Sequence, residues 1–309
     1  MSLHALSARQ LAASPHSIGD QTADTSSFYV ATSIVESAVE SYEQGEPEKA
    51  LKLFATALKT QRLTLGNIDL CVAHTLGNIG SVYLSMGWYD DASQVLAESL
   101  NIRLKLRDDP STRTNLPKGS EHIDLYETLN NLGSVEFLRG DYIKAMSYFH
   151  DCLKEITTVE IPGSTEMIAN TLYNIGHVHC VLCEFEDGLI AMNESLQLTQ
   201  SVFGHEDIRA AETIEKIGAI HMHKNKLDDA LSSFVEALRI TKMGLGSEHV
   251  DCAPSLYNVG LVYELRNEPR RAMDSYKAAL EIYGKNEVEN ADADRIRQRM
   301  MQLKVHHVR

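Results

Sequence analysis

The sequence predicts an all-α protein, a solenoid of about six helical hairpins that one further helix closes. The first observation is a five-residue phrase ending in glycine that returns along the chain. Its copies are Leu76–Gly80, Leu129–Gly133, Leu172–Gly176, Ile214–Gly218 and Leu256–Gly260. Their glycines lie 53, 43, 42 and 42 residues apart. A repeat period of about 20 to 50 residues is typical of stacked supersecondary units.

The second observation is that each period holds two amphipathic helices joined by a short turn. Around Gly176, small and apolar residues recur at helical spacing from Ala169 to His179, and a second stripe runs from Phe185 to Val202. Glycine and asparagine, which tolerate the left-handed conformation that ends a helix, fill most of the turns. The equivalent turn residues are Gly45, Gly87, Gly140, Cys183, Asn225 and Asn267.

The third observation is that the repeated glycine lies inside a predicted helix, where glycine costs about 1 kcal/mol relative to alanine. Its return therefore predicts a close approach of the second helix of the hairpin. That helix carries small residues at Ala50, Ala92, Ala145, Gly188, Ala230 and Ala272, and larger residues at Phe54, Leu96, Phe149, Met192, Phe234 and Tyr276. We expect the small residues to let the backbones approach and the large ones to fill the space between successive hairpins.

This pattern of Leu-Gly, Tyr, Ala, Phe and Ala resembles the tetratricopeptide repeat (TPR). Two copies are Ile79-Gly80, Tyr83, Ala92, Leu96 and Ser99, and Val259-Gly260, Tyr263, Ala272, Tyr276 and Ala279. A standard unit has about 34 residues, and the longer period here resembles the repeats of kinesin light chains. The linker phrases Phe203–Asp207 and Leu245–Asp251 are similar to that subfamily as well. The resemblance covers about residues 31 to 290 and implies a right-handed superhelix with a concave groove lined by the first helices.

The composition limits the classes of function. The chain has 309 residues, a net charge of −14 and five cysteines. Contacts to phosphates need clustered lysine and arginine, so we expect no nucleic-acid partner. No apolar run reaches the roughly 18 to 20 residues of a membrane span, so we expect no membrane insertion. Cysteines without a disulfide framework indicate a reducing compartment, and the expected location is cytoplasmic.

The chain is expected to divide into three parts. Residues 1–27 are rich in Ser, Ala and Thr and are predicted to be a disordered polar tail. Arg9 and the lack of acidic residues before Asp20 leave organelle targeting as an alternative to a plain tail. Residues 28–286 form the repeat array. Its first repeat carries Ser37-Ala38 where the others carry an apolar residue and glycine, as expected of an N-terminal cap.

Two further segments complete this division. Residues 107–120 form an insertion with two prolines, predicted to be a surface loop that is either tolerated or regulatory. Residues 287–309 are predicted to be a capping helix and a tail. Ile296, Met300 and Leu303 give this helix an apolar stripe between residues 292 and 305, and arginines give it a basic face.

The candidate binding residues are those that the resemblance to TPR proteins places in the groove. Asparagines stand two residues before the glycine at Asn78, Asn131, Asn174 and Asn258. An amide both donates and accepts, so such a ladder suits the backbone of an extended peptide. The alternative is that these amides hold neighbouring helices together. The other groove positions hold Ser81, Ser134 and His177 one residue after the glycine, and Leu138, Val181 and Leu265 five residues after it.

The charge of the predicted groove favours a neutral or basic extended segment of a protein or peptide partner. Glu127, Glu212 and Glu215 stand three or six residues before the glycine, and Lys216 opposes them. The partly apolar positions suit a hydrophobic anchor in the ligand.

Metal binding and catalysis receive little support from the sequence. His177, His179, Cys180 and Cys183 are metal-ligand types, but on a helix His179 and Cys180 point about 100° apart. Packing inside the array is the preferred interpretation of these residues. No phosphate-binding loop, dinucleotide fingerprint or catalytic triad motif is present. We therefore expect no enzyme activity, no metal site and no cofactor.

These observations favour an adaptor that binds a partner segment in the groove, similar to a kinesin light chain. Residues 1–30 lack the long heptad coiled coil through which those chains dock onto a motor. The alternatives are a regulatory sensor whose superhelix changes shape with a ligand, and self-assembly through exposed edges. The sequence leaves open the partner, the direction of the peptide, the oligomeric state and association with a motor.

Overall fold

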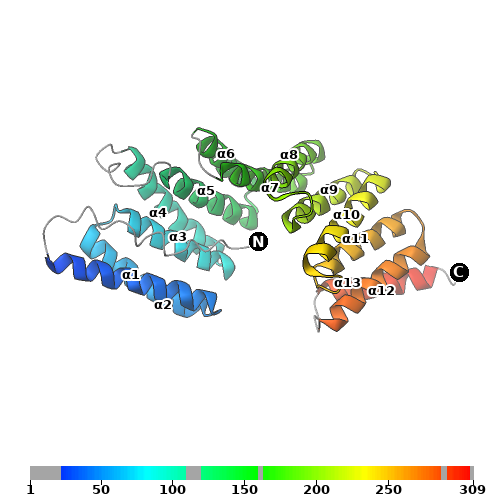
Figure 1. The fold of residues 1–309 in the computed structure, drawn as a ribbon, viewed down its shortest axis with the longest axis horizontal. Helices are drawn as coiled ribbons and strands as arrows, with labels where there is room; N and C mark the ends of the chain where they lie inside the picture. Colours follow the sequence, from blue (N-terminus) through cyan, green and yellow to red (C-terminus); the bar gives the residue numbers. More distant parts are fainter. Residues whose placement is uncertain (1–21, 109–119, 159–162, 287–290, 307–309) are drawn as a thin grey trace. The chain divides into compact units, whose positions relative to one another are not determined.

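The structure of the protein is a computed structural model that describes residues 22–108, 120–158, 163–286 and 291–306. These residues form thirteen α-helices and no β-strand, which confirms the predicted all-α class (Figure 1). The chain divides into two compact units, residues 1–164 and 165–309. The first unit contains α1 (Thr22–Glu43), α2 (Pro47–Leu65), α3 (Leu70–Ser85), α4 (Tyr89–Asp108), α5 (Ser120–Arg139) and α6 (Tyr142–Thr157). The second contains α7 (Ser164–Val181), α8 (Phe185–Phe203), α9 (Ile208–His223), α10 (Leu227–Leu245), α11 (Cys252–Leu265), α12 (Pro269–Lys285) and α13 (Ala291–His306).

Consecutive helices pair into hairpins, from α1 with α2 to α11 with α12. Within the first unit, α2 packs against α3, and α4 packs against α5. Within the second unit, α8 packs against α9 and α10 against α11, while α12 packs against α13. In each unit the second helix of one hairpin thus meets the first helix of the next, as in a stack of repeats.

The turn inside each hairpin carries the backbone hydrogen bonds of a Schellman motif. In the α3–α4 turn the N–H of Trp88 donates to the carbonyl oxygen of Tyr83 at 2.9 Å, and the N–H of Gly87 donates to that of Leu84 at 3.1 Å. The six turn residues predicted to be left-handed all have φ between 56° and 81°. One of them is Cys183, a residue type that adopts this conformation less readily than glycine or asparagine.

The predicted close approach of the two helices is confirmed. The large residues Phe54, Leu96, Phe149, Met192, Phe234 and Tyr276 are each at most 2% exposed. A Cβ atom added to Gly133 would lie 2.5 Å from Cε1 of Phe149, and one added to Gly260 would overlap the ring of Tyr276. Carbon atoms are most favourably about 3.5 to 4.0 Å apart, so the side chain of the second helix occupies the space that the missing Cβ leaves.

The last helix closes the array. Helix α13 agrees with the predicted capping helix to within one residue at each end, and its Ala293 and Ile296 are fully buried against α11 and α12. The predicted basic face is largely neutralised, because each arginine on it has a carboxylate partner. The ion pairs are Arg295 with Asp292, Arg297 with Asp294 and Arg299 with Glu264.

Two predicted boundaries need adjustment. Helix α1 begins at Thr22, so the end of the predicted 1–27 tail is helical, while residues 1–21 lie outside the described part of the chain. A helix held by its packed portion extends readily, since each added residue gains one hydrogen bond. Of the predicted insertion at 107–120, the first two residues complete α4 and Ser120 begins α5. Residues 109–119 lie outside the described part.

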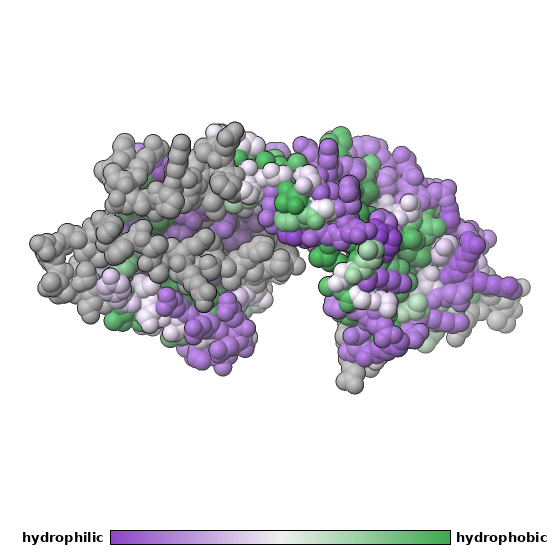
Figure 2. Space-filling view, in the orientation of Figure 1, coloured by the Kyte–Doolittle hydropathy of each residue, from purple (hydrophilic) through white to green (hydrophobic). Residues whose placement is uncertain are grey.

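The surface is mixed in polarity. In Figure 2, hydrophilic residues cover much of the visible face of the second unit, and hydrophobic residues lie among them over α10 and α11. None of the described helices combines the length and apolar character that a membrane crossing requires.

The glycine contact generates a stability prediction. Gly260→Ala should destabilise the protein by about 1 to 3 kcal/mol, because the new methyl group overlaps the buried ring of Tyr276. The matched control is Gly244→Ala in α10, where an added Cβ meets no atom within 4 Å. The control should leave stability unchanged or raise it by up to about 1 kcal/mol. Urea unfolding followed by far-ultraviolet circular dichroism measures both, and equal stability of the two variants would contradict the packing described above.

Candidate partner-binding surfaces

The first helix of each hairpin leaves one stripe accessible. The stripe comprises the positions six and two residues before the repeated glycine and one and five residues after it, which share one helical face. In α5 these are Glu127, Asn131, Ser134 and Leu138. In the five helices that carry the repeated glycine, the asparagine position is half-buried and the last position is exposed. In α3 and α5 the stripe therefore opens towards the end of the helix that leads into the hairpin turn, whereas in α7, α9 and α11 its first position is exposed as well.

In the first unit the predicted site residues lie on this stripe, with one correction. Asn78 and Asn131 are half-buried and Leu138 is exposed. The hydroxyl of Ser81 donates to the carbonyl oxygen of Gly77 at 3.2 Å. Ser134, expected to face the ligand, is buried and donates to the carbonyl oxygen of Asn130 at 2.9 Å. A short side chain that bonds back to its own helix contributes little to a binding surface.

A buried charged cluster lies beneath the stripe of the first unit, where α3, α4 and α5 meet. Nη1 of Arg103 lies 2.9 Å from Oδ2 of Asp124, in an ion pair without hydrogen-bond alignment. Nη2 of Arg103 lies 3.2 Å from Nδ1 of His74, and Nε2 of His74 lies 3.4 Å from Oδ2 of Asp124. Because arginine can only donate, Nδ1 must accept and the ring hydrogen belongs on Nε2, facing the carboxylate.

Glu127 belongs to the same cluster. Its Oε2 atom is buried and has no hydrogen-bond partner among the described residues. Burial and the nearby charge of Asp124 raise the pKa of Glu127 to about 7, although Arg103 opposes the shift. The negative charge expected at this groove position is therefore reduced at neutral pH.

In the second unit, Asn174 and His177 of α7 are half-buried, and Val181 is exposed at the end of the helix. Asn258 and Leu265 occupy the corresponding positions in α11. The ring of His177 lies beside Tyr173, with centroids 6.2 Å apart. Burial, together with the charge of Lys216, lowers the pKa of His177 and so favours the neutral imidazole.

Polar side chains also connect the first helices of the second unit. The hydroxyl of Tyr173 donates to Oε1 of Glu212 at 2.7 Å, which ties α7 to α9. Ser255 and Asn258 both donate to Oε1 of Glu215, at 2.9 and 3.3 Å, which ties α11 to α9. Burial raises the pKa of Glu215 despite these bonds. The amide of Asn258 therefore has the helix-bridging role that the sequence left open as an alternative.

His179 of α7 contacts a carboxylate of its own hairpin. Nδ1 of His179 lies 2.7 Å from Oε2 of Glu184, across the hairpin turn. Among the residues that the structure describes, no group of three histidine, cysteine or acidic side chains is placed to hold a metal ion.

The cluster around Arg103 was not predicted from the sequence. Arg103 lies on a second helix and Asp124 precedes the repeated phrase, so neither stands at a groove position. The available signal was that Arg103 falls on the buried stripe of α4, between Ile102 and Leu106. A charge on such a stripe requires a partner.

The raised pKa of Glu127 generates a prediction about pH. The ordinary pKa is 4.5 and the folded value is about 7, so between these values the folded chain retains a proton that the unfolded chain releases. Stability should therefore fall as the pH rises through this window. Glu127→Gln removes this loss. At pH 8 the free energy of unfolding of the variant should therefore exceed that of the wild type by on the order of 3 kcal/mol, with little difference at pH 4.

The measurement is urea unfolding at several pH values, followed by the fluorescence of Trp88. Trp88 is the single tryptophan of the chain and lies in the first unit, so it reports the unit that contains Glu127. The control is Glu98→Gln, an exposed carboxylate in the same unit that pairs with Arg62. Identical pH profiles for the wild type and Glu127→Gln would contradict the assignment.

Comparison with solved structures finds the same architecture. The crystal structure of BtubC (BKLC) from P. vanneervenii superposes with a TM-score of 0.60 at 17% identity, covering 87% of this chain and 94% of that one. Nearly identical TPR-like repeats from a Podosopora anserina protein assigned as a kinesin light chain superpose with a TM-score of 0.55 at 11% identity. That match covers 70% of this chain and 97% of the other. At these identities the likeness concerns the fold.

Comparison with curated proteins finds no match. Two family models, both described as tetratricopeptide repeat, match the sequence. One matches residues 37–105 and 209–285, and the other matches residues 127–156. Together they cover more than half of the chain, and the helices they match are the hairpins described above. The chain therefore belongs to the tetratricopeptide repeat family.

Proposed function

We propose that the protein is an adaptor that binds an extended or helical segment of a partner protein along the stripes of its first helices. The TPR fold supports a protein–protein interaction scaffold in general. The observation that carries the proposal is that every first helix of the repeated phrase keeps the same face accessible, whereas the large residues of the second helices are buried. The repeats thus reserve one helix face for contacts outside the hairpin.

The chemistry of the stripe suits a peptide backbone. Asn131 and Asn174 are half-buried on the stripe, and an asparagine side chain both donates and accepts hydrogen bonds. Leu138, Val181 and Leu265, between 39% and 58% exposed, follow at the open end of the stripe. These apolar side chains would hold a hydrophobic residue of the partner.

A neutral or basic segment of the partner fits the charges on the stripe best. Glu212 is exposed, and its Oε2 is available beside the Oε1 that accepts from Tyr173. Glu127 and Glu215 contribute less, since the pKa of both is raised by burial. The net charge of −14 would repel an acidic partner and attract a basic one. The five free thiols are consistent with the cytoplasmic location that we also propose.

The amide contacts are tested by a peptide array screened with the wild type and with Asn131→Ala plus Asn174→Ala. We expect the double variant to bind its peptides about tenfold more weakly, because two hydrogen-bonding groups of roughly 1 kcal/mol or less each are lost. The control is Asn193→Ala, an exposed amide on the second helix α8. Equal binding by the wild type and the double variant, with circular dichroism unchanged, would refute the amide ladder.

The charge preference has a separate test. Glu212→Gln keeps the acceptor for Tyr173 but removes the exposed charge, so binding of basic peptides should weaken about threefold and lose part of its salt dependence. Glu194→Gln on α8 changes the net charge equally, away from the stripe. Fluorescence anisotropy of a labelled basic peptide measures both variants. An equal effect of the two would mean that net charge alone sets the preference.

A further inference from the structure

The hairpin turn between α3 and α4 differs from the other five in the type of residue at one position. At the position that ends the Schellman motif, the other turns carry a charged side chain, at Glu46, Asp141, Glu184, Lys226 and Glu268. The α3–α4 turn carries Trp88, the single tryptophan of the chain, and its side chain is 48% exposed. The backbone of the turn is the same in all six, so the geometry of the turn does not require tryptophan.

Trp88 is held in a fixed orientation. Its ring stacks on Tyr83, with centroids 5.7 Å apart and an interplanar angle of 27°. The hydrogen bond from its backbone N–H to the carbonyl oxygen of Tyr83 anchors the same residue. One face of the indole is therefore covered while much of the ring remains accessible. A rigid aromatic side chain contributes contact area to binding at a low entropic cost.

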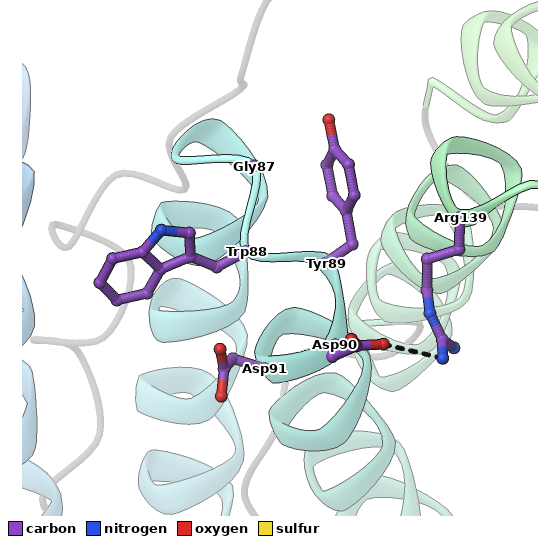
Figure 3. Close-up of a pocket in the computed structure, with 6 residues that line it drawn as sticks. All are labelled: Gly87, Trp88, Tyr89, Asp90, Asp91 and Arg139. Carbon is purple, nitrogen blue, oxygen red and sulfur yellow. Dashed lines mark ion pairs between the residues drawn. The ribbon is translucent and has the colours of Figure 1, made fainter.

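Two carboxylates follow in the first turn of α4. Asp90 pairs with Arg139 of α5 at 2.9 Å, as the dashed line in Figure 3 shows. Asp91 is exposed and forms no ion pair or hydrogen bond with the residues that the structure describes. Trp88 immediately precedes the helix and Asp91 is its third residue, so the two residues stand three positions apart in the chain. In Figure 3 the carboxylate of Asp91 lies on the same side of the turn as the indole.

These side chains border an open hollow of about 720 Å³, lined by Gly87, Trp88, Tyr89, Asp90, Asp91 and Arg139. Acidic residues at a helix N-terminus also stabilise the helix, so the carboxylates alone would not indicate a ligand. The exposed indole has no such role in the helix. Its combination with an uncompensated carboxylate in a hollow is a pairing that attracts organic cations.

We propose that this hollow binds an arginine side chain from a partner protein. The planar guanidinium stacks on the indole and donates two hydrogen bonds to Asp91, a geometry that the compact ammonium of lysine cannot reproduce. An apolar residue would leave Asp91 unpaired, and an acidic one would be repelled by Asp91, since Asp90 is already paired with Arg139. The site lies beyond the end of α3, outside the stripe of the proposed adaptor function, so either proposal can fail without the other.

Trp88 makes the site directly observable, since all tryptophan fluorescence of the protein arises from it. The probe is a blocked peptide Gly-Gly-Arg-Gly-Gly, titrated at low ionic strength, with peptides carrying lysine or citrulline in place of arginine. Citrulline keeps the shape of arginine but is uncharged. We expect a saturable change in emission at millimolar arginine peptide, a weaker response to lysine and none to citrulline.

Asp91→Asn should weaken binding of the arginine peptide about fivefold, because one partner of the guanidinium loses its charge. The matched control is Asp187→Asn, which removes a charge at the same position of the equivalent helix α8 in the second unit. Asp187→Asn should leave the titration unchanged. The proposal is overturned if the arginine peptide gives no saturable change, if citrulline binds equally well, or if the two variants behave alike.

Discussion

The approach of two helix backbones at the repeated glycine is the constraint on which the hairpins depend. Phe149 and Tyr276 occupy volume that a Cβ atom on Gly133 or Gly260 would fill. The position of the second helix in these hairpins is thus set by the missing Cβ atom of the first helix and the large aromatic ring of the second. Because a glycine and a large side chain return together in the five hairpins from α3–α4 to α11–α12, the same hairpin geometry returns, and the accessible stripe falls on the same face in each of them.

The architecture could be predicted because it depends on patterns between residues that are close together in the sequence. The spacing of glycines, the alternation of small and large residues and the turn residues each involve neighbours within one hairpin. The capping helix α13 was predicted on the same basis, from Ile296, Met300 and Leu303. What the pattern could not supply was the start of α1, which extends beyond the packed residues that make a helix recognisable in sequence.

The polar residues of the candidate surface were less predictable, because their roles depend on contacts between hairpins. Glu215 and Asn258 lie far apart in the sequence but bond to one another across α9 and α11. Arg103 and Asp124 meet beneath the stripe, and they change the charge that Glu127 presents. Each of these facts needs the distance between two side chains on different helices. A repeat pattern gives the position of a residue on its helix and leaves its partners undefined.

The shared backbone of the six turns has a consequence for how such a protein diversifies. Since main-chain hydrogen bonds define the bend, the side chain that completes it is free to be acidic, basic or aromatic, as Glu46, Lys226 and Trp88 illustrate. Natural variation or laboratory design can therefore change the chemistry at the tip of one hairpin while its neighbours and its own fold stay the same.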